Sequence, residues 1–372
     1  MTATHPIVGP SDVSLVITAH LDSATLHACL ASVARLDPPP REVVVVVDGG
    51  CEAVVAAAEK YGFRTLVPKV SGVAYARNAG ARRVSGAVLA FADSDVILFP
   101  DFVTCAVRAL AENPGASAAF GSYDAHPEAS GVVSQYRNLL HHFTHQRGSR
   151  AAQTFWAGCG EVRRNEFFAV GGFDATIRQP SVEDIDLGYR LRRAGYLIAL
   201  DPAWQVRHLK RWRFRDLVIT DIFRRAAPWT RLLLREGRFD DDLNLNKASR
   251  WSAALVCAAF AALTAGWWFP PALVASFICL AAVIGLNRHF YFFLAASRGW
   301  HFAAAAIPLH LLYFAGASTG FALECAAYFF QSMKASAFPH AQPMHFPRED
   351  EHPSPSRSRT LPRHAVPHDS VR

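Results

Sequence analysis

The 372 residues combine a hydrophobic fraction of 51% with only 19% charged residues, a balance that favours a membrane-associated protein. The charge is unevenly placed, because Trp251 to Asn287 contains no Asp, Glu, Lys or Arg while residues 1 to 250 hold most of the charged groups. A net charge of +7 suits phosphorylated substrates or an anionic membrane surface. No zinc-finger, helix-turn-helix or basic-aromatic RNA pattern is present, so we expect no nucleic-acid partner.

The cysteines and the first residues indicate where the N-terminal half resides. The seven cysteines are odd in number and never in C-x-x-C spacing, as in proteins of the reducing cytosol. The first apolar run, Val13 to Ala19, is too short and too poorly flanked for a secretory signal. We therefore expect the N-terminal half to stay on the cytoplasmic side of the cell membrane.

Short β-branched runs alternate with helical patterns in the first hundred residues. The predicted strands are Ser14 to Thr18, Glu42 to Val47, Arg64 to Val67 and Ala87 to Ala92. The predicted helices between them are Ala24 to Arg35, Cys51 to Tyr61 and Tyr75 to Val84. This alternation predicts a parallel sheet covered on both faces, in which ligands bind beyond the carboxyl ends of the strands.

The pattern loosens after Asp101, until a helix is predicted from Glu183 to Ala194 and closed by Gly195. Eight arginines then alternate with large apolar residues between Arg211 and Arg238. This pattern predicts one or two amphipathic helices, broken near Pro228, at a membrane interface. Ordinary helices that pack on the preceding domain are the alternative.

Three apolar segments follow, which we divide as Ser252 to Phe269, Ala272 to Leu286 and Phe302 to Phe330. A hydrocarbon core of about 30 Å needs about 20 helical residues, so the third segment can span while the first two are marginal. The alternative for those two is a buried hairpin or a re-entrant pair. Arg288 and Arg298 favour a cytoplasmic position for the connection before the third segment, and Glu324 within that segment is either paired or near the interface.

The expected boundaries are 1–210 for the α/β domain, 211–250 for the interfacial helices, 251–332 for about three membrane helices and 333–372 for a tail. Seven prolines with many Ser, His and Arg residues from Phe338 onward predict that the tail is disordered.

Carboxylates stand at the ends of two predicted strands and at the start of one helix. Asp48 ends the run of five valines and can bind a base or ribose, or merely form a turn. Asp93 and Asp95 follow the apolar strand and can supply oxygen ligands to Mg2+ or Mn2+. Glu183 and Asp184 open their helix, where a carboxylate can act as a general base or can only complement the helix dipole.

Residues 12 to about 210 resemble the family 2 glycosyltransferases of GT-A fold, because five motifs occur in the family's order. These are Val47-Asp48-Gly49, the segment Gly72 to Gly80 with Ala76-Arg77-Asn78, Asp93-Ser94-Asp95, Gly171-Gly172-Phe173-Asp174 and Glu183-Asp184. The resemblance implies a Rossmann-type nucleotide-sugar domain of GT-A fold, followed here by the interfacial helices and a small membrane bundle.

The resemblance also implies a role for each candidate residue. Asp48 would bind the nucleotide base, and Asp93 and Asp95 would bind ribose, metal and diphosphate. Asp184 would be the catalytic base with Glu183 beside it. Two further residues have both a functional and a structural interpretation. His208 would lie near the metal or diphosphate, or it has only a structural role. Arg77 would contact nucleotide or phosphate, or it is an ordinary arginine on a helix surface.

The implied reaction is an inverting transfer from a UDP- or GDP-sugar to a hydroxyl of a membrane lipid, a lipid-linked sugar or a cell-surface glycan. The sequence departs from the family pattern in two places. Thr18-Ala19-His20-Leu21 replaces the usual end of the first strand, and Gln205 lies six residues before Arg211, so the Gln-x-x-Arg-Trp motif of processive synthases is not met. A polysaccharide synthase and a non-catalytic nucleotide-sugar scaffold remain the alternatives, and a dinucleotide-dependent oxidoreductase lacks its glycine motif.

Overall fold

The computed structural model describes residues 5–177, 180–237 and 241–337. The chain divides into two compact units, Met1–Ala327 and Tyr328–Arg372. The sheet, the helices that cover it and the cavity described below belong to the first unit. The predicted disordered tail from Phe338 onward lies outside the described residues.

A mixed sheet forms the centre of the N-terminal domain, with strand order β3-β2-β1-β4-β8-β6-β9-β5 and β7 paired to β9. The strands are β1 Val13–Ala19, β2 Glu42–Val47, β3 Arg64–Leu66, β4 Val88–Asp93, β5 Val96–Leu98, β6 Ala116–Tyr123, β7 Ala151–Ala152, β8 Cys159–Arg163 and β9 Leu197–His208. The first four strands in this order are parallel, as predicted. The sheet is mixed beyond these four strands, because β8 runs antiparallel to both β4 and β6.

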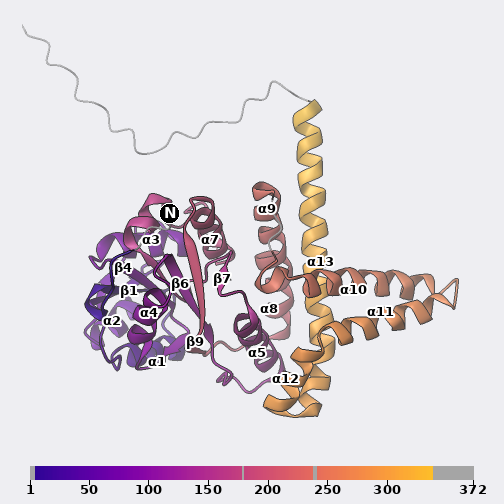
Figure 1. Cartoon of the computed structure of the whole chain (residues 1–372), viewed down its shortest axis with the longest axis horizontal. Helices are drawn as coiled ribbons and strands as arrows, with labels where there is room; N and C mark the ends of the chain where they lie inside the picture. Colours follow the sequence, from indigo (N-terminus) through magenta and orange to yellow (C-terminus); the bar gives the residue numbers. More distant parts are fainter. Residues whose placement is uncertain (1–4, 178–179, 238–240, 338–372) are drawn as a thin grey trace, which may run out of the picture. The chain divides into compact units, whose positions relative to one another are not determined.

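Helices cover both faces of this sheet, as expected (Figure 1). They are α1 Ala24–Val33, α2 Glu52–Lys60, α3 Val73–Arg83, α4 Phe102–Ala111, α5 Val132–Arg147, α6 Arg164–Ala169 and α7 Glu183–Arg193. Strand β1 shows the two-sided burial: Leu15 and Ile17 belong to the core with α1 and α4, and Val16 belongs to the core with α3 and α7. Gly80 lets α3 approach β1 closely, since a Cβ there would lie 2.5 Å from Val16 Cγ1.

The arginine-rich segment forms α8 Phe214–Ile219, a π-helical stretch η2 Thr220–Ala226 and α9 Ala227–Glu236, with Pro228 in the first turn of α9. The apolar side of α9 packs on α7, where Trp229 Nε1 donates a hydrogen bond to Tyr189 Oη at 2.9 Å. The apolar side of α9 therefore packs on the preceding domain, which was the alternative to a membrane-interface position. Phe214 and Phe223 stay exposed, and a membrane-interface position for the segment remains a prediction.

Four helices follow: α10 Lys247–Ala265, α11 Ala272–Leu286, α12 Arg288–Arg298 and α13 Trp300–Ala337. In the described part of the chain, α10 and α13 are long and apolar enough to cross a membrane, and α11 with α12 would give a third span if this pair, bent by 64°, counts as one. The predicted connection around Arg288 and Arg298 is thus itself a helix. The number of crossings and the orientation remain predictions.

Helix α5 joins the sheet domain to these helices. Tyr136, Leu139 and Leu140 of α5 share a buried cluster with residues of α10, α11, α12 and α13, among them Phe290 and Phe314. One helix of the N-terminal domain is therefore packed directly against the apolar C-terminal helices.

Candidate active site

A cavity of about 800 Å³ lies at the carboxyl ends of β1, β2 and β4. It is lined by all seven residues singled out from the sequence: Asp48, Arg77, Asp93, Asp95, Glu183, Asp184 and His208. Strand ends bring the first carboxylates there, and the start of α7 brings Glu183 and Asp184. The convergence predicted for residues 93, 95 and 184 is thus present in the structure.

Asp48 is held at the edge of the cavity by the segment before α3. Its Oδ1 accepts hydrogen bonds from Ser71 Oγ at 2.7 Å and from the backbone N–H of Gly72 at 3.0 Å. His20, from the unusual end of the first strand, contacts the Asp48 carbonyl oxygen through Nδ1 at 2.9 Å. The second carboxylate oxygen of Asp48 is without a hydrogen bond from the described residues, so it is available to a ligand.

Arg77 is buried between two carboxylates and is not a surface residue. Its guanidinium donates to Asp93 Oδ1 at 2.9 Å and to Glu183 Oε1 at 2.7 Å. The carboxylates of Glu183, Asp93 and Asp184 hold the pKa of Arg77 above its usual value although burial opposes this. Burial raises the pKa of Asp93, and the charge of Arg77 counters part of that rise. Arg77 therefore ties the end of β4 to the start of α7.

Two motifs that are distant in sequence are also joined beside Arg77. Asn78 Nδ2 donates to the Phe173 carbonyl at 2.7 Å, and the Phe173 N–H donates to Asn78 Oδ1 at 2.8 Å. Gly172 has φ +69°, and a Cβ on it would lie 2.5 Å from Asn78 Oδ1. The Gly-Gly-Phe-Asp turn thus requires glycine at position 172. Through Asn78, this turn fixes α3 against the segment that leads to α7.

Asp184 is the carboxylate best suited to accept a proton. Its Oδ2 accepts from the Ala157 N–H at 3.2 Å, and its Oδ1 accepts from the Ile185 N–H at 2.8 Å. Burial and the neighbouring Glu183 charge raise the pKa of Asp184 to about 7, although Arg77 acts in the opposite direction. A carboxylate with a pKa near neutrality is a stronger base than an exposed aspartate.

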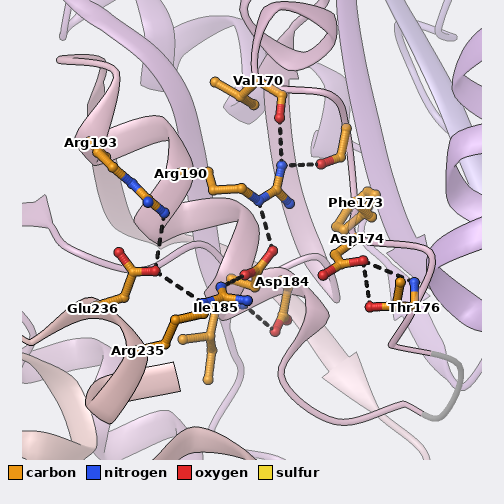
Figure 2. A network of polar contacts seen from close by, with 12 residues as sticks. Val170, Phe173, Asp174, Thr176, Asp184, Ile185, Arg190, Arg193, Arg235 and Glu236 are labelled. Carbon is orange, nitrogen blue, oxygen red and sulfur yellow. Dashed lines mark hydrogen bonds and ion pairs between the residues drawn. The ribbon is translucent and has the colours of Figure 1, made fainter. Parts of the chain in front are cut away.

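A network behind Asp184 holds α7 in place (Figure 2). Arg190 donates to the carbonyls of Val170 and Gly172 at 2.7 and 2.6 Å and to Asp186 at 2.8 Å. Arg235 of α9 also pairs with Asp186. The start of α7 is consequently fixed both to the Gly-Gly-Phe-Asp turn and to α9.

Asp95 faces His208 across 3.5 Å, measured between Oδ2 and Nε2. The His208 Nδ1 lies 2.6 Å from Asn138 Oδ1, a contact in which an Nδ1 proton is donated to the amide oxygen. His208 Nε2 and Asp95 Oδ2 then face each other, and either a proton on Nε2 or a cation bound between them makes this contact favourable. Burial opposes ionisation of Asp95, but the hydrogen bond and charge of His208 lower its pKa overall.

This donor set fits a divalent cation that arrives with a diphosphate. Within residues 5–177, 180–237 and 241–337, no three His, Cys, Asp or Glu side chains form a ready metal cluster. Mg2+ is usually held by one or two carboxylates together with phosphate oxygens, so a complete protein cage is not needed. Asp95, with Asp93 and His208 beside it, supplies that partial set.

The remaining cavity wall was not predicted from the sequence. Helix α5 contributes Arg137, Asn138, His141 and His145, the π-helical stretch contributes Arg224 and Arg225, and the loop before β8 contributes Trp156. Asn138, His141 and His145 are spaced by three and four residues and so share one helix face. This spacing could have indicated a polar helix face from the sequence, but it does not reveal that this face meets the cavity.

Acidic side chains at strand ends over a large cavity mark a candidate ligand site at the edge of this α/β sheet. Residues 14–175, which include β2 to β8, all but the first residue of β1 and most of the site residues, match the family model "Glycosyl transferase family 2". The match confirms the resemblance predicted from the motifs for this segment, and the helix-covered sheet confirms the predicted α/β class.

The sequence is similar to validoxylamine A glucosyltransferase of Streptomyces hygroscopicus subsp. limoneus, at 30% identity over 217 residues covering 49% of this chain and 48% of that protein. It is also similar to pre-mycofactocin glycosyltransferase of Mycobacterium tuberculosis, at 29% identity over 248 residues covering 60% and 48%. The chain spans about half the length of these curated relatives. A mannosyltransferase from Pyrobaculum calidifontis, solved with GDP-Man and Mn2+, aligns over 88% of both chains with 18% identity and a TM-score of 0.49.

Proposed function

We propose that the chain is an inverting, metal-dependent glycosyltransferase that uses a UDP- or GDP-sugar as donor. The observation that carries this proposal is the convergence of Asp48, Asp93, Asp95 and Asp184 on one cavity, with Arg77 linking two of its walls. In this proposal Asp48 receives the nucleotide base, and Asp93 with Arg77 receives the ribose and diphosphate end of the donor.

Asp184 acts as the general base. Its carboxylate removes the proton from an acceptor hydroxyl, and the hydroxyl oxygen forms a bond to the anomeric carbon of the sugar. The bond between that carbon and the diphosphate oxygen breaks in the same displacement, so the anomeric configuration is inverted. The pKa of about 7 for Asp184 suits this task because the proton must be taken at neutral pH.

Asp95, Asp93 and His208 would hold Mg2+ or Mn2+, which when bound neutralises charge on the departing nucleoside diphosphate. Asn138 keeps the His208 ring oriented, so that Nε2 remains directed at Asp95.

The acceptor belongs to the membrane in this proposal. Helices α10 and α13 meet the length and hydropathy of membrane spans, and α5, which contributes several residues to the cavity wall, packs against them. A lipid, a lipid-linked sugar or a growing cell-surface glycan would then approach Asp184 from the side of these helices, with the N-terminal domain in the cytoplasm.

Purified chain in uncharged detergent should release nucleoside diphosphate from a panel of UDP- and GDP-sugars with Mn2+ or Mg2+ and extracted membrane lipids. Asp184→Asn should abolish release but preserve donor binding in calorimetry. Asp216→Asn, an exposed change on α8, is the matched control. Donor binding without turnover by the unchanged chain would instead support a nucleotide-sugar scaffold.

A further inference from the structure

Two arginines of the π-helical stretch line the cavity without a carboxylate partner. Among the described residues, neither Arg224 nor Arg225 forms an ion pair through its guanidinium. Other arginines of this wall are neutralised: Arg137 pairs with Asp221 at 2.8 Å, and Arg77 pairs with Asp93 and Glu183. Two guanidinium groups without an ion-pair partner among the described residues, exposed Arg224 and half-buried Arg225, therefore line one side of the cavity.

The surroundings of Arg225 make its charge unfavourable in the empty cavity. Its side chain is half-buried, and burial together with the nearby Arg137 cation lowers its pKa. Tyr313 and the carboxylates of Asp221 and Asp184 act in the opposite direction. A cation left without a partner at such a position costs free energy that a bound anion would offset.

Arg225 lies on the side of the cavity that meets the apolar helices. It also lines a small cavity of about 10 Å³ together with Arg137, His141 and Asn244. Asn244 in turn lines a second large cavity of about 390 Å³, whose walls come from α5, α10, α12 and α13 among others. Asp48, Arg77 and Asp93 line neither of these two cavities, so Arg225 stands on the acceptor side and not on the nucleotide side.

Helix α13 fixes the backbone that carries both arginines. A Cβ on Gly320 would lie 2.5 Å from Ala226 Cβ and 2.8 Å from the Ile222 carbonyl, so the two helices are in close contact. One turn further along α13, Glu324 accepts two hydrogen bonds from Arg231 at 2.6 and 3.0 Å. Glu324 is thus paired, and α13 holds the cationic stretch against the cavity.

We infer that Arg225, with Arg224 beside it, is a phosphate-binding subsite for the acceptor, which is an amphiphile bearing a phosphate group close to its reacting hydroxyl. The inference rests on the proposed function and narrows its acceptor class. Guanidinium groups bind phosphate oxygens through charge-assisted hydrogen bonds. Two unpaired arginines match the two negative charges of a lipid-linked diphosphate.

The test uses n-dodecyl phosphate as the probe, titrated into the full chain in uncharged detergent with EDTA present, and tryptophan fluorescence reports binding. Arg225→Gln should weaken binding about ten- to a hundredfold, since hydrogen bonds to charged groups are at stake. Arg215→Gln, an exposed arginine of α8 that does not line the cavity, should leave binding unchanged. Binding of UDP or GDP with Mn2+ should be the same in all three proteins.

Equal binding of dodecyl phosphate to both variants would overturn the subsite. A loss of nucleotide binding in Arg225→Gln, without loss of dodecyl phosphate binding, would overturn it as well and assign the arginine to the donor. If Arg225→Gln does not fold, Arg225→Lys keeps the charge but loses the planar fork, and an intermediate affinity is expected. Failure of the proposed function would be seen separately, as absence of nucleoside diphosphate release despite Arg225-dependent probe binding.

Discussion

Replacing Arg77 by Met removes the buried cation between Asp93 and Glu183. The Arg77 side chain is 6% exposed and that of Glu183 is 5% exposed, so loss of their 2.7 Å contact leaves the Glu183 carboxylate buried without its partner. Asp93, which is 31% exposed, loses a contact of 2.9 Å. Breaking a buried ion pair from one side typically destabilises by about 3–5 kcal/mol. For a domain of this size we expect the melting temperature to fall by on the order of 10 °C.

The Arg77→Met substitution should also change the pKa of Asp184, the proposed general base. Arg77 lowers the pKa of Asp184, so its removal raises that pKa, and the pH midpoint of activity should move upward in any protein that still folds. Scanning fluorimetry and a pH series of nucleoside diphosphate release measure the two effects. Arg64→Met is the matched control, because the Arg64 side chain is 52% exposed in its contact with Glu42 and should cost at most about 1 kcal/mol. Similar small shifts in both variants would refute the reasoning.

Two further outcomes are expected. Gly320→Leu should lower the melting temperature and the acceptor-dependent activity, because its side chain would meet the backbone of η2, whereas Gly285→Ala, with nothing within 4 Å, should change neither; a stable and fully active Gly320→Leu would contradict the proposed contact. Chelation with EDTA should stop turnover until Mn2+ or Mg2+ is restored, and Asp95→Asn should raise the metal concentration required by about tenfold or more. Turnover that is insensitive to EDTA would count against the metal assignment.

The sequence predicts the first half of the sheet because its strands are strongly patterned. Four of the five valines of β2 and the apolar run of β4 are buried, and an aspartate stands at the carboxyl end of each run. The carboxylates that line the cavity could therefore be found from two strand ends and one helix start alone.

The second half of the sheet was missed for a physical reason. Strand β6, with sequence Ala-Ser-Ala-Ala-Phe-Gly-Ser-Tyr, is rich in small residues with low intrinsic preference for strands, and β8 contains only one β-branched residue. These strands are stabilised by being in the middle of the sheet, between partners that are distant in sequence. Gly121 illustrates this, since a Cβ there would lie 2.1 Å from the Trp204 carbonyl.

The part of the cavity wall formed by α5 and η2 was missed because it is built from tertiary contacts. Arg225 and His141 look like ordinary helix residues in the sequence, and only the packing of α5 and α13 brings them to the cavity. The unpaired state of Arg225 depends on which carboxylates lie near it in space, which no local pattern encodes.

The most direct measurement is the pH dependence of kcat/KM for nucleoside diphosphate release with saturating divalent cation. The account predicts that kcat/KM rises with pH as a single group loses its proton with an apparent pKa of about 7, and that Asp184→Asn removes both the activity and this dependence. Retained activity in Asp184→Asn with the same pH dependence would contradict the assignment of Asp184 as the base.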